Sequence, residues 1–274
     1  MGAQAHEISV GTTDIEITAN YETQYYLTVN TDPSGLTPQP EISPPELWYD
    51  NGTLVTCTAQ TVSRYTFDQW TVDETSQGQG INPITITMNE PHTAIAHYST
   101  HDIATTNVTP SKTVIGQNYT LSIYVAVENQ GDYTETFNVT VYVNTTTIQT
   151  KTLTLTSGNS TTINFTWNTS GFAYANCTIW AYVWPVSGET DAEDNTFVDG
   201  YVFVSIPGDV NGDKKVNILD CILIANHFGH ADGDGHTPGS KKWFDCVNCD
   251  INSDARTNVL DCIVLSNNFG KSWT

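Results

Sequence analysis

The chain has 274 residues, enough for two or three domains with hydrophobic cores, and its 30 acidic against 9 basic side chains give a formal net charge of −21. A surface this negative repels nucleic acid and anionic lipid, and no run of about 18 apolar residues is present to span a bilayer, so we exclude nucleic-acid binding and membrane insertion. Only 14% of the residues are charged, whereas Thr, Asn, Tyr and Trp are abundant, which predicts a mainly β protein whose carboxylates suit hard cations.

Residues 1–23 are predicted to form an N-terminal extended segment. Two short alternating stretches, Glu7–Val10 and Asp14–Thr18, are separated by a Gly-Thr-Thr turn and predict strands without an obvious partner of their own. These strands either complete the following domain or pair with a neighbouring molecule, because an unpaired strand is a template for another chain.

Residues 24–99 predict a small all-β domain. The aromatic side chains at Tyr65, Phe67 and Trp70 favour the core of a sandwich. The stretches 65–70 (Tyr-Thr-Phe-Asp-Gln-Trp) and 82–88 (Asn-Pro-Ile-Thr-Ile-Thr-Met) resemble the divergent β-repeat domains of bacterial and archaeal cell-surface proteins. That resemblance implies a spacer or adhesion role. The expected strands are 26–29, 53–59, 65–72, 83–88 and 93–98.

Residues 100–206 predict a second sandwich of about seven strands, separated by turn signals such as Asn129-Gln130-Gly131. An opening Asp102, Val-Glu-Asn-Gln-Gly at 127–131 and Glu-Thr-Asp…Asp-Asn at 189–195 occur in order, and this pattern resembles the CARDB family of immunoglobulin-like adhesion domains. Its acidic turn is either a solvated loop or an additional cation site. The acidic residues of the turn are Glu189, Asp191, Glu193 and Asp194. The expected strands are 101–103, 121–127, 137–143, 152–155, 162–167, 177–183 and 198–204.

Residues 207–274 contain an internal repeat at an offset of 41 residues. Each copy has Asp, Asn, Asp, Asn and Asp at positions 1, 3, 5, 9 and 12 of a loop, the convergence of oxygen ligands that Ca²⁺ requires. Position 7 contributes its backbone carbonyl, and the Asp at position 12 opens a helix, at 218–228 and 259–269, that ends before a glycine. The sequence thus predicts two Ca²⁺ ions. The expected ligands are Asp209, Asn211, Asp213, Lys215, Asn217 and Asp220 in the first loop, and Asp250, Asn252, Asp254, Arg256, Asn258 and Asp261 in the second.

Two loop–helix units with Asp at position 12 resemble a dockerin, which implies calcium-dependent binding to a cohesin domain of another protein. The chain departs from that pattern in two places. Position 6 is Lys214 and Ala255 instead of Gly, and positions 10 and 11 are apolar instead of Ser-Thr. The apolar pairs indicate a hydrophobic docking face, or burial against the protein's own β-domain. The expected partner-binding residues are Ile218, Leu219, Val259 and Leu260.

The chain has six cysteines. Cys57 and Cys177 stand alone in separate β-domains and are expected to be buried thiols. The other four flank the calcium loops and are predicted to form disulfides, with three pairings possible. A zinc site is the competing interpretation, but it needs four converging thiolates and only one close pair is present. The disulfide candidates are Cys221, Cys246, Cys249 and Cys262.

Nine Asn-x-Ser/Thr sequons occur, eight of them within 107–178, which favours a secreted glycoprotein at the cell surface. Their asparagines are Asn51, Asn107, Asn118, Asn138, Asn144, Asn159, Asn164, Asn168 and Asn176.

No nucleophile motif, zinc-protease motif or phosphate-binding glycine loop is present, so we predict a protein without enzymatic activity. We expect two tandem immunoglobulin-like β-sandwiches followed by a small helical dockerin-like module. Two functions fit this architecture. The module docks into a cohesin-like domain on another protein, or copies of the chain assemble through the apolar face or the N-terminal strand into a calcium-stabilised cell-surface filament or surface layer.

Overall fold

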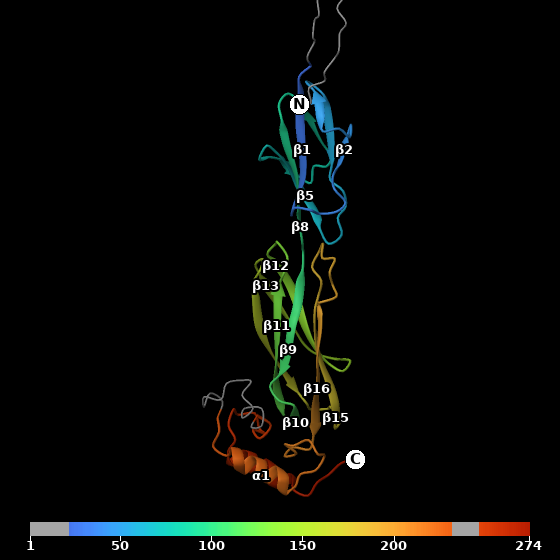
Figure 1. Ribbon diagram of the computed structural model, residues 1–274. Coiled ribbons are helices and arrows are strands. Elements are labelled where there is room, and N and C mark those ends of the chain that lie inside the picture. Colours follow the sequence, from blue (N-terminus) through green and yellow to red (C-terminus); the bar gives the residue numbers. More distant parts are fainter. Residues whose placement is uncertain (1–21, 232–246) are drawn as a thin grey trace, which may run out of the picture. The chain divides into compact units, whose positions relative to one another are not determined.

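The computed structural model describes residues 22–231 and 247–274 (Figure 1). The chain divides into two compact units. The first runs to Val62 and resumes at Phe67–Tyr98, and the second contains Ser63–Thr66 and Ser99–Thr274. The predicted strands at 7–10 and 14–18, and most of the connection between the two calcium loops, lie outside the described residues. Within the described part of the chain, no helix is long and apolar enough to cross a membrane.

The first unit is built from a five-stranded and a three-stranded sheet. All five predicted strands form, and Trp70, which is fully buried, lies in the core as its aromatic pattern predicts. Three further strands were not predicted because they are short or, at 75–79, polar throughout. The larger sheet has the order β3 (Trp48–Asp50), β1 (Gln24–Asp32), β8 (His92–Ser99), β5 (Thr66–Val72) and β6 (Thr75–Gln79), and the smaller one has β2 (Glu41–Ser43), β4 (Leu54–Thr58) and β7 (Ile84–Thr87).

The second unit contains a sandwich of eight strands, one more than predicted, and the strand predicted at 101–103 instead runs from Ile103 to Pro110. The additional strand, β10, has three residues, too few to show an alternating pattern. One sheet has the order β10 (Val114–Gly116), β16 (Thr196–Ser205), β15 (Ala175–Val183), β12 (Glu135–Val143) and β13 (Thr146–Leu155). The facing sheet has β14 (Ser160–Asn168), β11 (Thr120–Asn129) and β9 (Ile103–Pro110).

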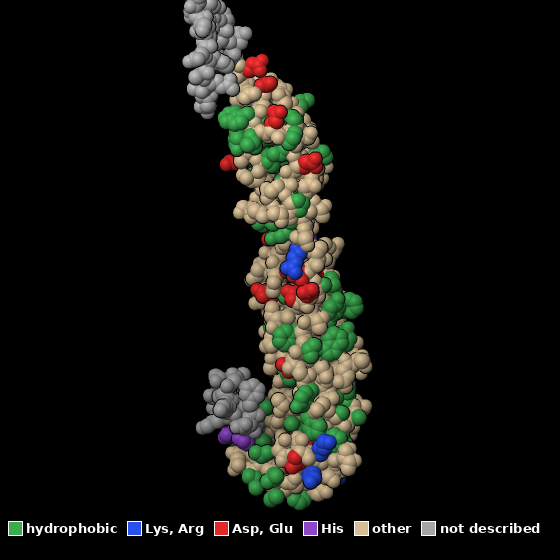
Figure 2. Space-filling model, turned by 45° about the vertical axis from the view of Figure 1, so that its right-hand side comes forward, with side chains coloured by type: hydrophobic (Ala, Val, Ile, Leu, Met, Phe, Trp, Pro, Cys, Tyr) green, Lys and Arg blue, Asp and Glu red, His purple; other side chains and the backbone are tan. Residues whose placement is uncertain are grey.

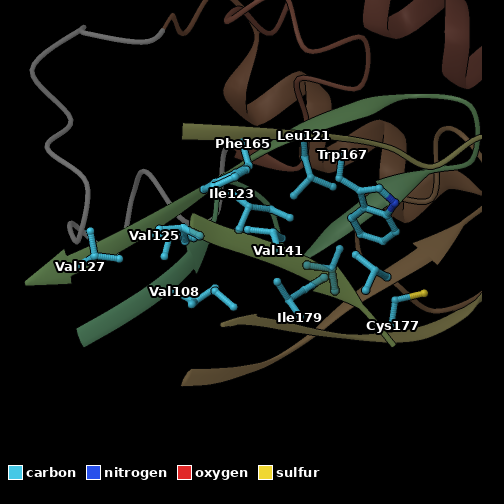
Figure 3. Packing of buried hydrophobic residues seen from close by; sticks show 14 of the residues in the cluster. Val108, Leu121, Ile123, Val125, Val127, Val141, Phe165, Trp167, Cys177 and Ile179 are labelled. Atoms are coloured by element: carbon cyan, nitrogen blue, oxygen red, sulfur yellow. The ribbon is translucent and has the colours of Figure 1, made fainter. Parts of the chain in front are cut away.

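The sandwich core is formed by alternate residues of its strands. In β11, Leu121, Ile123 and Val125 point inward and are at most 3% exposed, because successive side chains of a strand face opposite sides of the sheet. Figure 3 shows these side chains packed with others from the two sheets, including Trp167. The mainly β fold with immunoglobulin-like character is therefore confirmed.

Two short helices complete the second unit: α1 (Ile218–His227) and α3 (Val259–Asn268). Each starts at its predicted residue and ends one residue before its predicted end. Asn217 and Asn258 cap their N-termini, each in a reciprocal capping box with the aspartate at the third helical position. Gly229 and Gly270 follow the helices with φ of 89° and 82°, a backbone conformation that favours glycine and ends a helix.

Replacing Ile123 by Ala is expected to lower the free energy of unfolding of the sandwich by about 2–5 kcal/mol, because it leaves a cavity in a fully packed core. Tyr124→Thr is the matched control, since Tyr124 is the next residue of β11 and is 43% exposed; its effect should stay within about 0.5 kcal/mol. Urea unfolding of the full chain measures both. Equal losses in the two variants would contradict the inward and outward assignment of this strand.

Candidate functional site

The two loops of the C-terminal module wrap around their first aspartate. Asp209 Oδ1 accepts hydrogen bonds from the backbone N–H of Gly212 at 2.8 Å and of Asp213 at 3.1 Å, and its Oδ2 accepts from Lys214 N at 2.9 Å. Asp250 accepts in the same way from Asp254 N and Ala255 N, both at 3.1 Å. Backbone N–H groups thus hold the position-1 carboxylate at the centre of each loop.

The aspartate at position 12 closes each loop. Asp220 Oδ1 accepts from Val210 N at 2.9 Å, and Asp261 Oδ1 accepts from Ile251 N at 2.7 Å. Both aspartates are fully buried. The other carboxylate oxygen accepts the N–H of the helix N-cap residue, so one side chain joins the start of the loop to the start of the helix.

Burial raises the pKa of Asp209, Asp220 and Asp250 above the ordinary range of a carboxyl group. Burial thus disfavours the charged form of these carboxylates, and a bound cation would offset that cost. Within 22–231 and 247–274 no three Asp, Glu, His or Cys side chains converge on one point. A cation in either loop would therefore be bound by carboxylates together with amide and backbone carbonyl oxygens.

The remaining predicted ligands lie at the edge of each loop. Asn211 Oδ1 accepts from Asp213 N at 2.9 Å, and Asp213 Oδ1 accepts from Lys215 N at 3.0 Å. Asn252 and Asp254 repeat this pattern with Arg256 N at the end of the loop. The amide at position 9 has a different role, because Asn217 Oδ1 accepts the N–H of Leu219 and so caps the helix.

Position 6 takes up the left-handed backbone conformation although it carries no glycine. Lys214 has φ of 72° and Ala255 has φ of 67°. A residue other than glycine in this backbone conformation is less stable by about 1–2 kcal/mol. The turn therefore forms in spite of an unfavourable local conformation. Both loops thus keep, without glycine, the left-handed backbone conformation that glycine adopts most easily.

The end of each helix pairs with the opposite loop. Gly270 N donates to Val216 O at 2.8 Å, and Val216 N donates to Lys271 O at 2.9 Å. Gly229 and His230 make the equivalent pair of bonds with Thr257, at 2.8 and 2.9 Å. The two copies of the repeat are therefore joined by backbone hydrogen bonds and share one small core.

The sandwich binds the second loop through a buried lysine. Lys112, 5% exposed and located between β9 and β10, donates from Nζ to Ser253 Oγ at 2.8 Å and to the carbonyl of Asp250. Its Nζ lies 3.8 Å from Asp250 Oδ2. Ser253 Oγ in turn donates to Thr120 O at 2.6 Å. Burial lowers the pKa of Lys112, and Asp250 opposes that shift.

The sandwich contacts the first loop through neutral groups. The hydroxyl of Ser205, in β16, hydrogen-bonds to Asp209 Oδ2, and it accepts from Trp273 Nε1 at 3.1 Å. The Trp273 ring stacks on Phe203 with the ring centroids 5.6 Å apart. A Cβ added to Gly212 would lie 3.1 Å from Val114 Cγ2, so this loop lies directly against the sandwich. None of these docking contacts was predicted from the sequence.

The apolar residues at positions 10 and 11 face away from the sandwich. Their exposed fractions range from 49% to 61%, so they are not buried against the protein's own β-domain, one of the two alternatives that the sequence left open. The next turns of both helices extend this surface, and the two copies contribute equivalent residues. In Figure 2, hydrophobic side chains (green) lie at the lower end of the molecule. We call this surface the apolar helix face; it consists of Ile218, Leu219, Ile222, Phe228, Val259, Leu260, Ile263 and Phe269.

The cysteines divide into two groups. Cys57 and Cys177 are buried in the two β-units as expected, and burial raises the pKa of Cys57 to about 11. Cys221 and Cys262 occupy equivalent places on α1 and α3 as partly buried thiols. Cys249 is buried in the core of the module, and Cys246 lies outside the described residues. Disulfide formation among these four remains a prediction.

Comparison with protein-family models identifies three modules. Residues 25–102 match the divergent InlB B-repeat domain, 100–197 match CARDB, and 207–270 match the dockerin type I domain. The suspected domain composition is thereby confirmed. Dockerin domains generally bind calcium and a protein partner, and dockerin and CARDB modules are typical of extracellular or cell-surface proteins. A search of curated proteins gave no match.

Three solved structures that are similar to the chain each match 38–39% of it. The CARDB domain of a Pyrococcus furiosus protein, crystallised with di-metal ions, is 22% identical, with a TM-score of 0.34, over 39% of this chain and 94% of that one. A domain of a Methanosarcina acetivorans protein described as a cell surface protein is 28% identical, with a TM-score of 0.32. The match covers 38% of this chain and 91% of that domain. A β-glucosidase from Erythrobacter marinus is 15% identical with a TM-score of 0.31, over 38% of this chain and 15% of the enzyme.

Lys112→Met is expected to loosen the C-terminal module from the sandwich, because it leaves the Asp250 carbonyl and the Ser253 hydroxyl without their buried cationic donor. The free energy that holds the module on the sandwich is expected to fall by about 2 kcal/mol. Backbone amides of residues 247–254 that exchange when the module detaches should then exchange roughly 30-fold faster. Lys271→Met is the control, because the Lys271 side chain is exposed and its ammonium donates to Asn268 Oδ1 within the module, not to the sandwich. Equal exchange in both variants would contradict the role of Lys112.

Proposed function

We propose that this protein is an extracellular, calcium-dependent protein-binding module without enzymatic activity. The observation that carries the proposal is the matched geometry of the two loops together with the apolar helix face. The loops contain buried carboxylates that could bind cations. The helices α1 and α3, which follow the loops, expose one apolar surface to solvent. Cation binding and partner binding would thus act through the same helices.

The residues of each loop fit calcium. The donors are oxygen atoms only, and Ca²⁺ takes six to eight of them in a flexible arrangement. We assign one ion to each loop, bound by the aspartates at positions 1, 5 and 12, the Asn at position 3 and the carbonyl of position 7. The Asn at position 9 would act through water, since its oxygen caps the helix. The ion would stabilise carboxylates whose burial otherwise opposes their charge.

The apolar helix face supports a protein as the partner. Contiguous exposed apolar side chains on a soluble protein mark interaction sites, and the two helices supply equivalent residues because the sequence is duplicated. A cohesin-like domain on another protein is the occupant we favour, since the module matches the dockerin type I model. A second copy of this chain is the alternative, because it would cover the same surface and build a calcium-stabilised filament or surface layer.

Asp220→Ala and Asp261→Ala are each expected to remove one bound Ca²⁺ and to loosen the module, because each deletes a position-12 ligand and the link between loop and helix. Since the two repeats are joined by backbone hydrogen bonds and share one core, either change should speed hydrogen exchange in both helices. Titration calorimetry with CaCl₂ counts the ions, and Asp199→Ala, an exposed aspartate of β16, is the control. An unchanged ion count in the double variant would overturn the assignment.

Leu219→Asp and Leu260→Asp are expected to abolish partner binding while leaving calcium binding intact, because they place charge on the apolar helix face. Val198→Asp is the matched control: Val198 is 58% exposed but lies on the sandwich. The first measurement is size-exclusion light scattering in millimolar calcium and in excess chelator.

Assemblies that dissolve on chelation, and that only the two leucine variants prevent, would identify the second copy as partner. A monomer in both conditions directs the test to pull-down with a cohesin domain, where the same two variants should lose binding. Binding that persists in both leucine variants would contradict the role of this face.

A further inference from the structure

The sandwich carries a second group of acidic residues, away from the calcium loops, where β9 and β16 begin. Asp102 immediately precedes β9, and Asp194 and Asn195 immediately precede β16. The two strand starts are tied together by Thr105, whose N–H donates to Asp194 O and whose Oγ1 donates to Asn195 O, both at 2.9 Å. One backbone bond and one side-chain bond of Thr105 thus bring together residues that are up to 90 positions apart in the sequence.

Several polar atoms here are buried without a hydrogen-bond partner. Asp102 Oδ1 and Asp194 Oδ1 are inaccessible and unbonded, and Asn195, which is 0% exposed, has neither amide atom bonded. Native proteins bond more than 90% of their buried polar groups, so four such atoms in three neighbouring residues require an explanation. Solvation of the turn does not supply it, because these atoms do not reach bulk water.

The charge of the group also points to a cation. Burial, together with the nearby carboxylates of Asp194, Glu189 and Asp191, raises the pKa of Asp102 to about 6. The cationic side chain bonded to this group is Arg64, which is 61% exposed and contacts Asp191 at 2.9 Å, not the buried oxygens. Glu189 has both oxygens occupied by backbone N–H groups of Ile103 and Val186, so it shapes the turn.

We propose that Asp102, Asp194 and Asn195 bind a divalent cation, with Ca²⁺ as the ion, at the start of β9 and β16. The donors would be two carboxylates and one amide oxygen, completed by backbone or water oxygens; a cage of three carboxylates is not formed in the described chain. Oxygen donors without sulfur or imidazole select a hard cation. The ion would fix the acidic turn 189–195 against the first strand of the sandwich.

The test uses the full chain with Asp102→Asn and Asp194→Asn, which keep the size of each side chain and remove its charge. Asp199→Asn is the control, an aspartate exposed on β16. Titration calorimetry with CaCl₂ should count three ions in the wild type and in the control, and two in each variant. Calcium should slow hydrogen exchange at 100–105 and 186–195 in the wild type and not in the two variants.

Either of two results would overturn the proposal. In the first, the wild type, the two variants and the control bind the same number of ions, and calcium slows their hydrogen exchange at 100–105 and 186–195 equally. That result is expected if buried water fills the site. The other is a variant that loses protection at 100–105 already in chelator, since that shows a purely structural carboxylate. The loop sites are tested separately: the double variant Asp220→Ala/Asp261→Ala should lose two ions and keep the calcium protection of the sandwich turn.

Discussion

Buried carboxylates that accept backbone N–H bonds determine the shape of the C-terminal module. Asp220 and Asp261 each join the start of a loop to the start of a helix, and Asp209 and Asp250 hold the turns between. Such bonds favour the charged form, whereas the burial around them disfavours it. A cation in each loop would resolve this conflict, so calcium binding and folding of the module are expected to be one process.

The contacts between the module and the sandwich determine which surface of the module stays exposed for a partner. The fourth position of each loop meets the sandwich, through Gly212 in one copy and Ser253 in the other. Because the loops face the sandwich, the outer sides of α1 and α3 stay exposed with their apolar residues. The module is therefore part of the second compact unit, and a partner would meet a surface whose loops contact the sandwich.

Much of this architecture could be predicted from the sequence. The repeat at 41 residues located both loops, the aspartates at position 12 located the helix starts, and Gly229 and Gly270 located the helix ends. The capping role of Asn217 and Asn258, which the sequence predicted as calcium ligands, became visible only in the structure. Short strands such as β3 and β10 escaped prediction, since three residues show no period. The contacts of Lys112 with Asp250 and Ser253, 138 and 141 positions away, were not predicted either. A local sequence pattern contains no information about which distant residues a side chain will contact.

The docking contacts also make two nearly identical loops chemically unequal. The first-position aspartate of one loop meets the hydroxyl of Ser205, and that of the other lies 3.8 Å from the ammonium of Lys112. An ammonium beside a carboxylate stabilises its charge when no other cation is present, yet it repels a second cation at the same oxygens. At an effective dielectric constant near 20, two unit charges 4 Å apart interact by about 4 kcal/mol, enough to separate the behaviour of the two loops. Duplication of the sequence thus supplies two copies of one ligand set, and the asymmetry of the surface on which they dock gives each copy its own electrostatic surroundings.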